Sequence, residues 1–316
     1  MTEAAPGGHP YHRVHRAVAG PGDWWRPVLG VLTLAFGVVI LAPVVVLAGF
    51  STGYVVAGAD LDVDRLIDTD NATPAGLAYV FLVLASAIPI TWAISRIVHG
   101  LPPRWLSSVA PRIRWRWLAA CLGLAVLALA ATLLVSGLLP DQGGADLSGE
   151  PNDFTSTTRD FLLIVLLLTP LQAAGEEYAF RGYLTQAFGG LTRHAWVAVA
   201  IPSLLFALAH GLGQSWPIFF DRLAFGLVAG TLVIVTGGLE AGIAMHVLNN
   251  WLAFSIALAY DDMSTALNPT GGTWWSIPVT LTQSLTYLGL VVFAGRRMGL
   301  RTTSNPGVLE ASRGRV

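Results

Sequence analysis

The chain alternates between long apolar runs and short polar stretches. About 20 apolar residues in a helix are enough to cross the hydrocarbon core of a bilayer, which is roughly 30 Å thick. The runs therefore predict eight membrane spans at 28–50, 75–98, 118–139, 160–188, 195–212, 219–235, 239–260 and 275–294. We accordingly expect an all-α fold, a polytopic membrane protein built as a bundle of about eight transmembrane helices.

The polar stretches divide this bundle into regions. Residues 1–27 are rich in Gly, Pro and His and predict a flexible cytoplasmic arm. The region 28–140 holds spans 1–3 and the region 160–295 holds spans 4–8, with an acidic loop between them. Residues 296–316 form a basic cytoplasmic tail. No internal repeat and no soluble domain is indicated.

Composition supports this interpretation, since 54% of the 316 residues are hydrophobic and only 12% are charged. That charged share is about half of the value usual in soluble domains. All 18 basic residues are Arg; fourteen of them fall on the side that would hold both termini, three fall on the other side, and Arg181 lies within a predicted span. This asymmetry predicts cytoplasmic N- and C-termini in a cell membrane. The Gly- and Ala-rich, Lys-free composition indicates a bacterial source.

The loop between spans 2 and 3 carries Arg side chains interleaved with Trp105, Trp115 and Trp117. Between two membrane spans this pattern is typical of residues that anchor at lipid headgroups, so we expect membrane lipids rather than nucleic acid as partners. The single cysteine, Cys121, excludes an internal disulfide and any site that needs several cysteines. Gly226 and Gly230, four residues apart in span 6, indicate close helix packing.

Three charged residues lie near the end of the apolar run that begins at Phe161. They are Glu176, Glu177 and Arg181, and each would cost roughly 2.5–3.5 kcal/mol at the centre of a bilayer. Glu177 and Arg181 are four residues apart and can form an ion pair on one helix face. Glu176 points about 100° away from them and has no local partner in this interpretation. A carboxylate of this kind is a candidate general base.

Two further polar pairs lie inside apolar helices. Phe206 and His210 are one turn apart in span 5, and His246 and Asn250 share one face of span 7. A single histidine in a membrane helix is more often a hydrogen-bonded packing residue than a catalytic one. Together with Glu176, however, these residues supply a base, imidazoles for proton transfer or metal binding, and an amide donor for a developing oxyanion.

The motifs Glu-Glu-x-x-x-Arg at 176–181, Phe-x-x-x-His at 206–210 and His-x-x-x-Asn at 246–250 resemble the three motifs of the CPBP family. This family includes type 2 CAAX prenyl endopeptidases, bacteriocin-processing and immunity proteins, and lysostaphin-resistance-like (Abi domain) proteins. The resemblance covers about residues 160–255, with the motifs in the family's order. It implies an all-helical intramembrane endopeptidase fold.

The resemblance also implies roles for individual residues. Glu176 would activate the attacking water with the help of His210, while His246 and Asn250 would stabilise the oxyanion of the tetrahedral intermediate. Glu177 and Arg181 would position these groups through their ion pair.

Two mechanisms stay open for this site. In one, Glu176, His210 and His246 bind a catalytic zinc ion that has water as its fourth ligand. In the other, the enzyme is a glutamic protease that uses no metal.

Other interpretations are weaker. The chain has neither the His-Glu-x-x-His motif of zinc proteases nor the Gly-x-Ser-Gly motif of rhomboid-type enzymes. The alternatives are a catalytically silent immunity or scaffold protein of the same fold, and an ion-coupled transporter, although the repeats typical of transporters are absent. We expect the substrate to be a membrane-tethered peptide or protein, and a bacterial substrate in preference to a prenylated CAAX protein.

The predicted helices raise one difficulty. As straight rods, spans 4 and 5 would hold Glu176 and His210 at different depths in the membrane. A break at Pro170 or Pro202 is one way to bring the two residues together. We expect the three motifs to form one site in spite of this difference.

Overall fold

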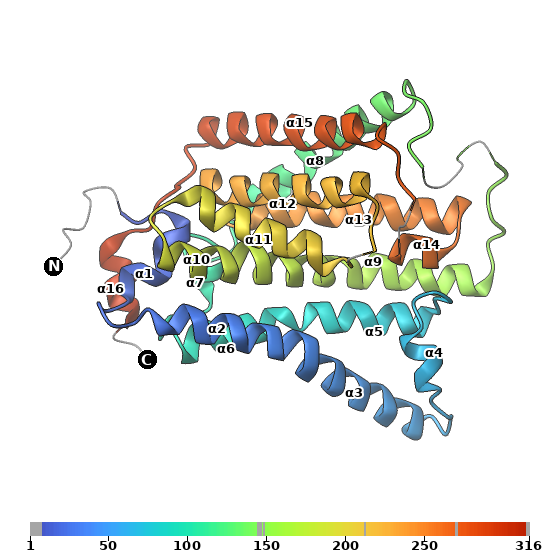
Figure 1. The fold of residues 1–316 in the computed structure, drawn as a ribbon, viewed down its shortest axis with the longest axis horizontal. Coiled ribbons are helices and arrows are strands. Elements are labelled where there is room, and N and C mark those ends of the chain that lie inside the picture. Colours follow the sequence, from blue (N-terminus) through green and yellow to red (C-terminus); the bar gives the residue numbers. More distant parts are fainter. Residues whose placement is uncertain (1–7, 144–146, 148, 212, 269–270, 314–316) are drawn as a thin grey trace.

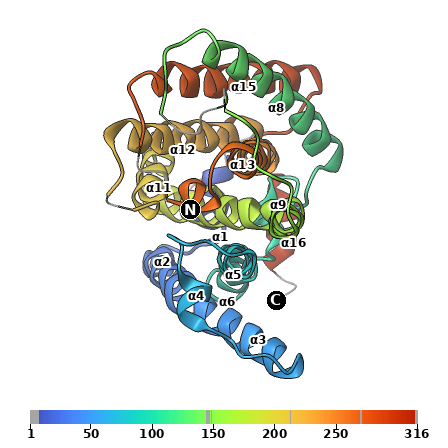
Figure 2. The same ribbon diagram turned by 90° about the vertical axis from the view of Figure 1, so that its right-hand side faces the viewer.

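The structure, a computed structural model, describes residues 8–143, 147, 149–211, 213–268 and 271–313. Within these residues the regular structure is helical, and the only β-type pairings are two isolated bridges. The helices run roughly side by side, and α9 (Ser156–Glu176) lies between α5 (Pro74–Ala85) and α13 (Glu240–Tyr260) (Figures 1 and 2). The all-α fold expected from the sequence is confirmed.

Seven helices of the described chain are long and apolar enough to cross a membrane. They cover Trp25–Val56, Pro74–Ile97, Trp115–Ser136, Ser156–Leu191, Trp216–Thr236, Glu240–Tyr260 and Ser276–Arg297. The remaining predicted span corresponds to α11 (Ala195–Ala209), an apolar helix of 15 residues. At 1.5 Å per residue α11 is about 22 Å long, so it reaches only part of the way through a 30 Å core.

The shorter elements connect these helices or flank them. They are η1 (Tyr11–Arg13), α1 (Val14–Val18), α4 (Val63–Ile67), α7 (Arg104–Ser107), α14 (Met263–Leu267) and α16 (Pro306–Arg313).

The first span bends at Pro43. It consists of α2 (Trp25–Phe36), a π-helical segment η2 (Gly37–Leu41) and α3 (Ala42–Val56). Proline lacks the N–H that would continue the α-helical hydrogen-bond ladder, and a π-helical turn accommodates the loss. As a result α3 diverges from the rest of the bundle, as Figure 1 shows.

The prolines of the predicted spans 4 and 5 do not break their helices. Pro170 lies inside α9 and Pro202 lies inside α11. The hydrogen-bond register changes instead at η3 (Glu177–Leu184), a π-helical segment that continues into α10 (Thr185–Leu191). This change falls on the Glu-Glu-x-x-x-Arg motif, so the geometry of the charged residues differs from that of a plain α-helix.

Glycines allow the central helices to approach closely. A Cβ atom at Gly175 would lie 2.3 Å from the carbonyl oxygen of Leu84, so the backbones of α9 and α5 are in direct contact there. The small face predicted in α12 (Trp216–Thr236) has the same function. Added Cβ atoms at Gly226 and Gly230 would lie within 3 Å of side-chain atoms of α11. These contacts fix α9 and α11, the helices that carry two of the three motifs.

The N-terminal segment, predicted as a flexible arm over 1–27, is instead packed against the bundle from residue 8 onward. Tyr11 and Val14 are fully buried, and the Tyr11 hydroxyl donates to the Leu106 carbonyl oxygen. Arg13 Nη1 donates to the carbonyl oxygens of Gly189 and Thr192, at 2.9 and 2.6 Å, and so caps the C-terminal end of α10. The segment docks because it contains apolar side chains that become buried against the bundle.

The C-terminal segment packs at the same end of the bundle. The backbone N–H of Ser304 donates to the His9 carbonyl oxygen at 2.8 Å, and α16 contacts α1. The first and last described segments therefore lie at the same end of the bundle.

The loop of alternating Arg and Trp side chains is more buried than its pattern predicted. Trp105 and Trp117 are 0% and 2% exposed, whereas Trp115 is 72% exposed. Arg114 bonds Glu240 through its side chain, with Nε–Oε1 and Nη2–Oε2 distances of 2.8 and 2.6 Å. Only part of the loop can therefore serve as a headgroup anchor, because Arg114 joins the start of α8 (Trp115–Ser136) to the start of α13.

Candidate active site

The three motifs meet where α9, α11 and α13 adjoin η3. Glu176 is the last residue of α9, and Glu177 and Arg181 belong to the π-helical segment η3. π-Helical turns inside α-helices are rare and occur frequently at functional sites. His246 lies on α13, and its ring approaches both glutamates. The helix packing thus assembles the ionisable residues in the interior of the bundle.

The ion pair predicted between Glu177 and Arg181 is present. Arg181 Nη1 lies 3.1 Å from Glu177 Oε1, and neither side chain is more than 2% exposed. Glu177 Oε1 also lies 3.0 Å from Nδ1 of His246. Because an ionised carboxylate only accepts hydrogen bonds, His246 donates through Nδ1 and its ring is fixed with Nε2 facing Glu176.

Aromatic faces surround the guanidinium group of Arg181. Its Cζ atom lies 4.1 Å from the ring centroid of Phe206 and 5.4 Å from that of Phe225. No aligned hydrogen bond reaches Nη1 or Nη2 of Arg181 from the described residues. The buried cation is therefore held by its charge contact with Glu177 and by cation–π contacts.

Glu176 has a local partner that the sequence interpretation missed. Gln172, one turn earlier on α9, donates from Nε2 to Glu176 Oε1 at 2.8 Å and accepts from Asn250 Nδ2 at 3.0 Å. The second oxygen, Glu176 Oε2, lies 3.5 Å from His246 Nε2. Among the described residues no hydrogen-bond partner reaches that buried oxygen. One carboxylate oxygen is thus held in place and the other is left available.

His210 stands at the edge of this network. It follows the last residue of α11, is exposed, and bonds through Nδ1 to the carbonyl oxygen of Phe206 at 2.8 Å. Its ring centroid is 4.6 Å from that of Phe206, which in turn lies 6.0 Å from the ring of His246. The structure therefore joins Glu176, Glu177, Arg181, His246 and Asn250 by direct contacts and places His210 beside them through Phe206.

The residues proposed as zinc ligands do not form a metal site in this arrangement. Both ring nitrogens of His246 face carboxylates, and Nδ1 of His210 bonds its own helix. The described chain contains no group of three His, Cys, Asp or Glu side chains suited to hold a metal ion. The buried guanidinium of Arg181 also adds positive charge close to the cluster.

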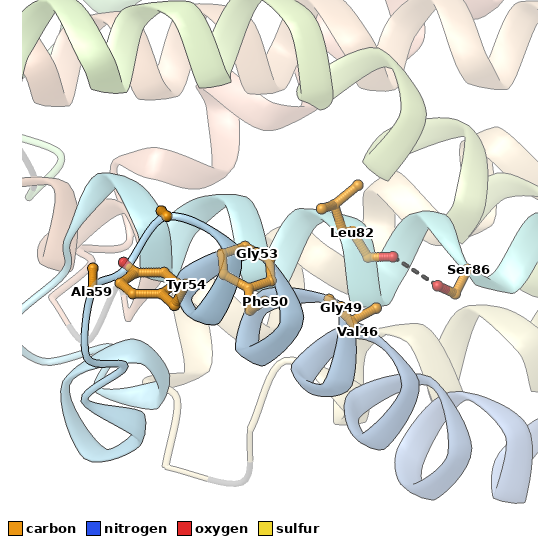
Figure 3. A pocket seen from close by; sticks show the side chains of 9 residues that line it. Val46, Gly49, Phe50, Gly53, Tyr54, Ala59, Leu82 and Ser86 are labelled. Atoms are coloured by element: carbon orange, nitrogen blue, oxygen red, sulfur yellow. Dashed lines mark hydrogen bonds between the residues drawn. The ribbon is translucent and has the colours of Figure 1, made fainter.

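A large hollow of the described structure lies away from these residues. It has a volume of about 670 Å³ and is lined by α3 and by residues of the second span, among them Phe50, Tyr54, Leu82 and Ser86 (Figure 3). None of the motif residues lines it. The hollow lies between α3 and the second span, and no carboxylate or imidazole lines it, so it is not the candidate reaction site.

Two residues of the site had a signal in the sequence that was overlooked. Gln172 precedes Glu176 by four residues, the spacing that places side chains on one face of a helix. Gly242 precedes His246 by the same spacing, and a Cβ atom there would lie 2.5 Å from Glu177 Oε2. Phe225, by contrast, has no sequence signal, since an aromatic residue in an apolar helix is ordinary packing.

Fold and site together define a polytopic α-helical membrane protein with a buried cluster of glutamate, histidine and amide side chains. Residues 158–252 match the family model described as Type II CAAX prenyl endopeptidase Rce1-like. The matched segment contains the three motifs, so the resemblance that they indicated is confirmed.

A relative in Bacillus subtilis (strain 168), the uncharacterized protein YyaK, is 26% identical over 292 residues, which cover 88% of this chain and 94% of the relative. No solved structure matches the chain significantly.

Proposed function

We propose that the protein is an intramembrane endopeptidase that hydrolyses a peptide bond of a membrane-associated peptide or protein. The observation that carries this proposal is the buried network in which Glu176 keeps one oxygen without a hydrogen-bond partner among the described residues, next to His246. The family match supports a protease of this type. The substrate that we propose is bacterial, in keeping with the relative in Bacillus subtilis.

In the proposed reaction Glu176 removes a proton from a water molecule, and the resulting oxygen attacks the carbonyl carbon of the scissile bond. His210, at the edge of the network, assists by orienting the water. The carbonyl oxygen becomes an oxyanion, which the second N–H of Asn250 stabilises together with His246 in its imidazolium form, the form in which Nε2 also carries a proton to donate. The C–N bond then breaks, the proton held by Glu176 moves to the leaving nitrogen, and a carboxylic acid and an amine are released.

Glu177 and Arg181 act indirectly in this proposal. Their ion pair fixes the position of His246, because the same oxygen of Glu177 lies 3.1 Å from Arg181 and 3.0 Å from His246. The reaction uses only side chains of the chain, so we propose the glutamic mechanism rather than the zinc-dependent one. Cleavage that persists after treatment with a tight chelator is the expected result. Cleavage that a chelator abolishes and added zinc restores would contradict the glutamic mechanism.

The test uses purified protein in lipid vesicles and a mixture of lipid-anchored peptides, with products identified by mass spectrometry. We expect cleavage by the wild-type protein and none by Glu176→Gln or His210→Ala, although both variants accumulate in the membrane. Thr231→Val is the matched control, because Thr231 is only partly buried and its hydroxyl bonds only its own helix. Equal cleavage by the wild type and both site variants would refute the proposal.

A further inference from the structure

We propose that Gln172 is a positioning residue that sets the orientation of Glu176 and Asn250 relative to each other. This inference rests on the proposed function, since it assigns a task within the same site. Gln172 is 5% exposed and lies on α9, one turn before Glu176. Its amide group joins the candidate base on its own helix to the candidate oxyanion donor on α13.

The direction of both hydrogen bonds follows from the chemistry of the groups. An ionised carboxylate only accepts, so the Gln172 nitrogen must face Glu176 Oε1, at 2.8 Å. The Gln172 oxygen then faces Asn250, which must present its nitrogen, at 3.0 Å. The chain of bonds therefore fixes which way the amide of Asn250 is turned. It leaves Asn250 with one further N–H for an oxyanion.

Only a side chain with a donor and an acceptor at its end can make both contacts at once. Methionine has about the length of glutamine and leucine is shorter, but neither offers an N–H donor or a carbonyl acceptor, and asparagine would not reach both partners. A carboxylate at position 172 would place a second negative charge beside Glu176. An amide is thus needed at this position because Glu176 requires a donor and Asn250 requires an acceptor.

Packing alone does not account for Gln172, because α9 and α13 have another tie nearby. Trp251 Nε1 donates to the carbonyl oxygen of Val165 at 3.0 Å. This bond joins the same two helices and does not involve the amide of Gln172. Removal of the amide is therefore expected to leave the helices together and to release only the orientation of Glu176 and Asn250.

The experiment measures kcat and KM separately for a lipid-anchored peptide that the wild-type protein cleaves. Gln172→Leu is expected to lower kcat about 10- to 100-fold, because small displacements of reacting groups have effects of this size. KM is expected to stay within about twofold. The control is Thr169→Val, one turn earlier on α9, where the buried hydroxyl has no hydrogen-bond partner among the described residues. This control should retain the wild-type kcat.

A double-mutant cycle with Asn250→Ala separates positioning from a general loss of stability. If Gln172 acts through Asn250, Gln172→Leu should cost much less in the Asn250→Ala background than in the wild type. If the kcat of the double variant falls by the product of the two single-variant losses, the proposal is overturned. An unchanged kcat in Gln172→Leu would overturn it as well. Gln172→Met replaces the leucine variant if that variant does not accumulate in the membrane.

The outcome also distinguishes this inference from the proposed function. An inactive Glu176→Gln protein together with a fully active Gln172→Leu protein refutes the role of Gln172 alone. A fully active Glu176→Gln protein refutes the proposed function itself.

Discussion

The contact between Gly242 and Glu177 allows a sharp test of how the site is packed. A Cβ atom at Gly242 would lie 2.5 Å from Glu177 Oε2, about 0.9 Å closer than the 3.4 Å at which ordinary contacts begin. The Gly242→Ala variant must therefore move the carboxylate or separate α13 from η3. Glu177 is fully buried, so it has no open space in which to turn.

The consequences can be worked out from the contacts of Glu177. A displacement of about 0.9 Å directed away from His246 would lengthen the 3.0 Å contact between Glu177 Oε1 and Nδ1 to about 3.9 Å, beyond hydrogen-bond distance. His246 would lose the contact that fixes its ring. Overpacking of this kind costs about 1–3 kcal/mol, against which the better helix propensity of alanine returns about 1 kcal/mol. We expect a net destabilisation of up to about 2 kcal/mol and at least a tenfold loss of cleavage.

The assay combines the melting temperature in detergent with the cleavage rate in vesicles. Gly289→Ala is the matched control, since Gly289 lies in α15 (Ser276–Arg297) and an added Cβ atom would meet nothing within 4 Å. That variant should be as active as the wild type and no less stable. If Gly242→Ala matches the wild type in both measurements, the tight packing described for Glu177 is wrong.

Two further predictions concern the structure around the site. Glu240→Ala leaves the cation of Arg114, whose side chain is 11% exposed, without its carboxylate partner. We therefore expect the variant to lose about 3–5 kcal/mol of stability, measured as a lower melting temperature. An unchanged melting temperature would contradict this prediction. The stacked rings of His15 and His99, 4.0 Å apart, predict that docking of the N-terminal segment depends on pH. Burial, followed by the charge of Arg26, lowers the pKa of His99 to about 4, and burial also lowers the pKa of His15. These folded pKa values lie below the unfolded value of about 6.5. Docking is therefore strongest above pH 6.5 and weakens as the pH falls toward 4. His99 alone would reduce the free energy of docking by about 3 kcal/mol over this range. Amide hydrogen exchange of residues 8–18, corrected for its intrinsic pH dependence, should show less protection at pH 5 than at pH 7.5, and equal protection would refute this reasoning.

The sequence predicted the membrane helices well because one physical requirement governs every segment inside a bilayer. Every backbone polar group must be paired inside the hydrocarbon, so apolar runs of sufficient length form helices whatever their neighbours are. The run at 195–212 shows the limit of this argument. Its helix, α11, ends at Ala209, since the chain leaves the helix at His210 and Gly211, where φ is +106°.

The N-terminal segment shows a second limit. Its polar composition predicted a flexible arm, yet Tyr11 and Val14 find buried positions against the ends of the helices. Composition averages over a segment and so misses a few apolar residues that have a place to dock.

The candidate site also has a part that the sequence predicted and a part that it did not. Local spacing determined the Glu177–Arg181 ion pair and the shared face of His246 and Asn250, because a helix fixes the positions of residues three and four apart. Spacing carried no information about which carboxylate would face which imidazole.

That choice depends on the tertiary structure. The π-helical turn at η3 resets the angles of the side chains that follow Glu176, and Gly242 lets α13 approach closely enough for His246 to contact both glutamates. Such contacts arise between residues about 70 positions apart and depend on the distance between helix backbones, which no local pattern records. The sequence by itself determined the helices and the chemical groups that they carry; the packing of α9 against α13 decided how those groups face one another.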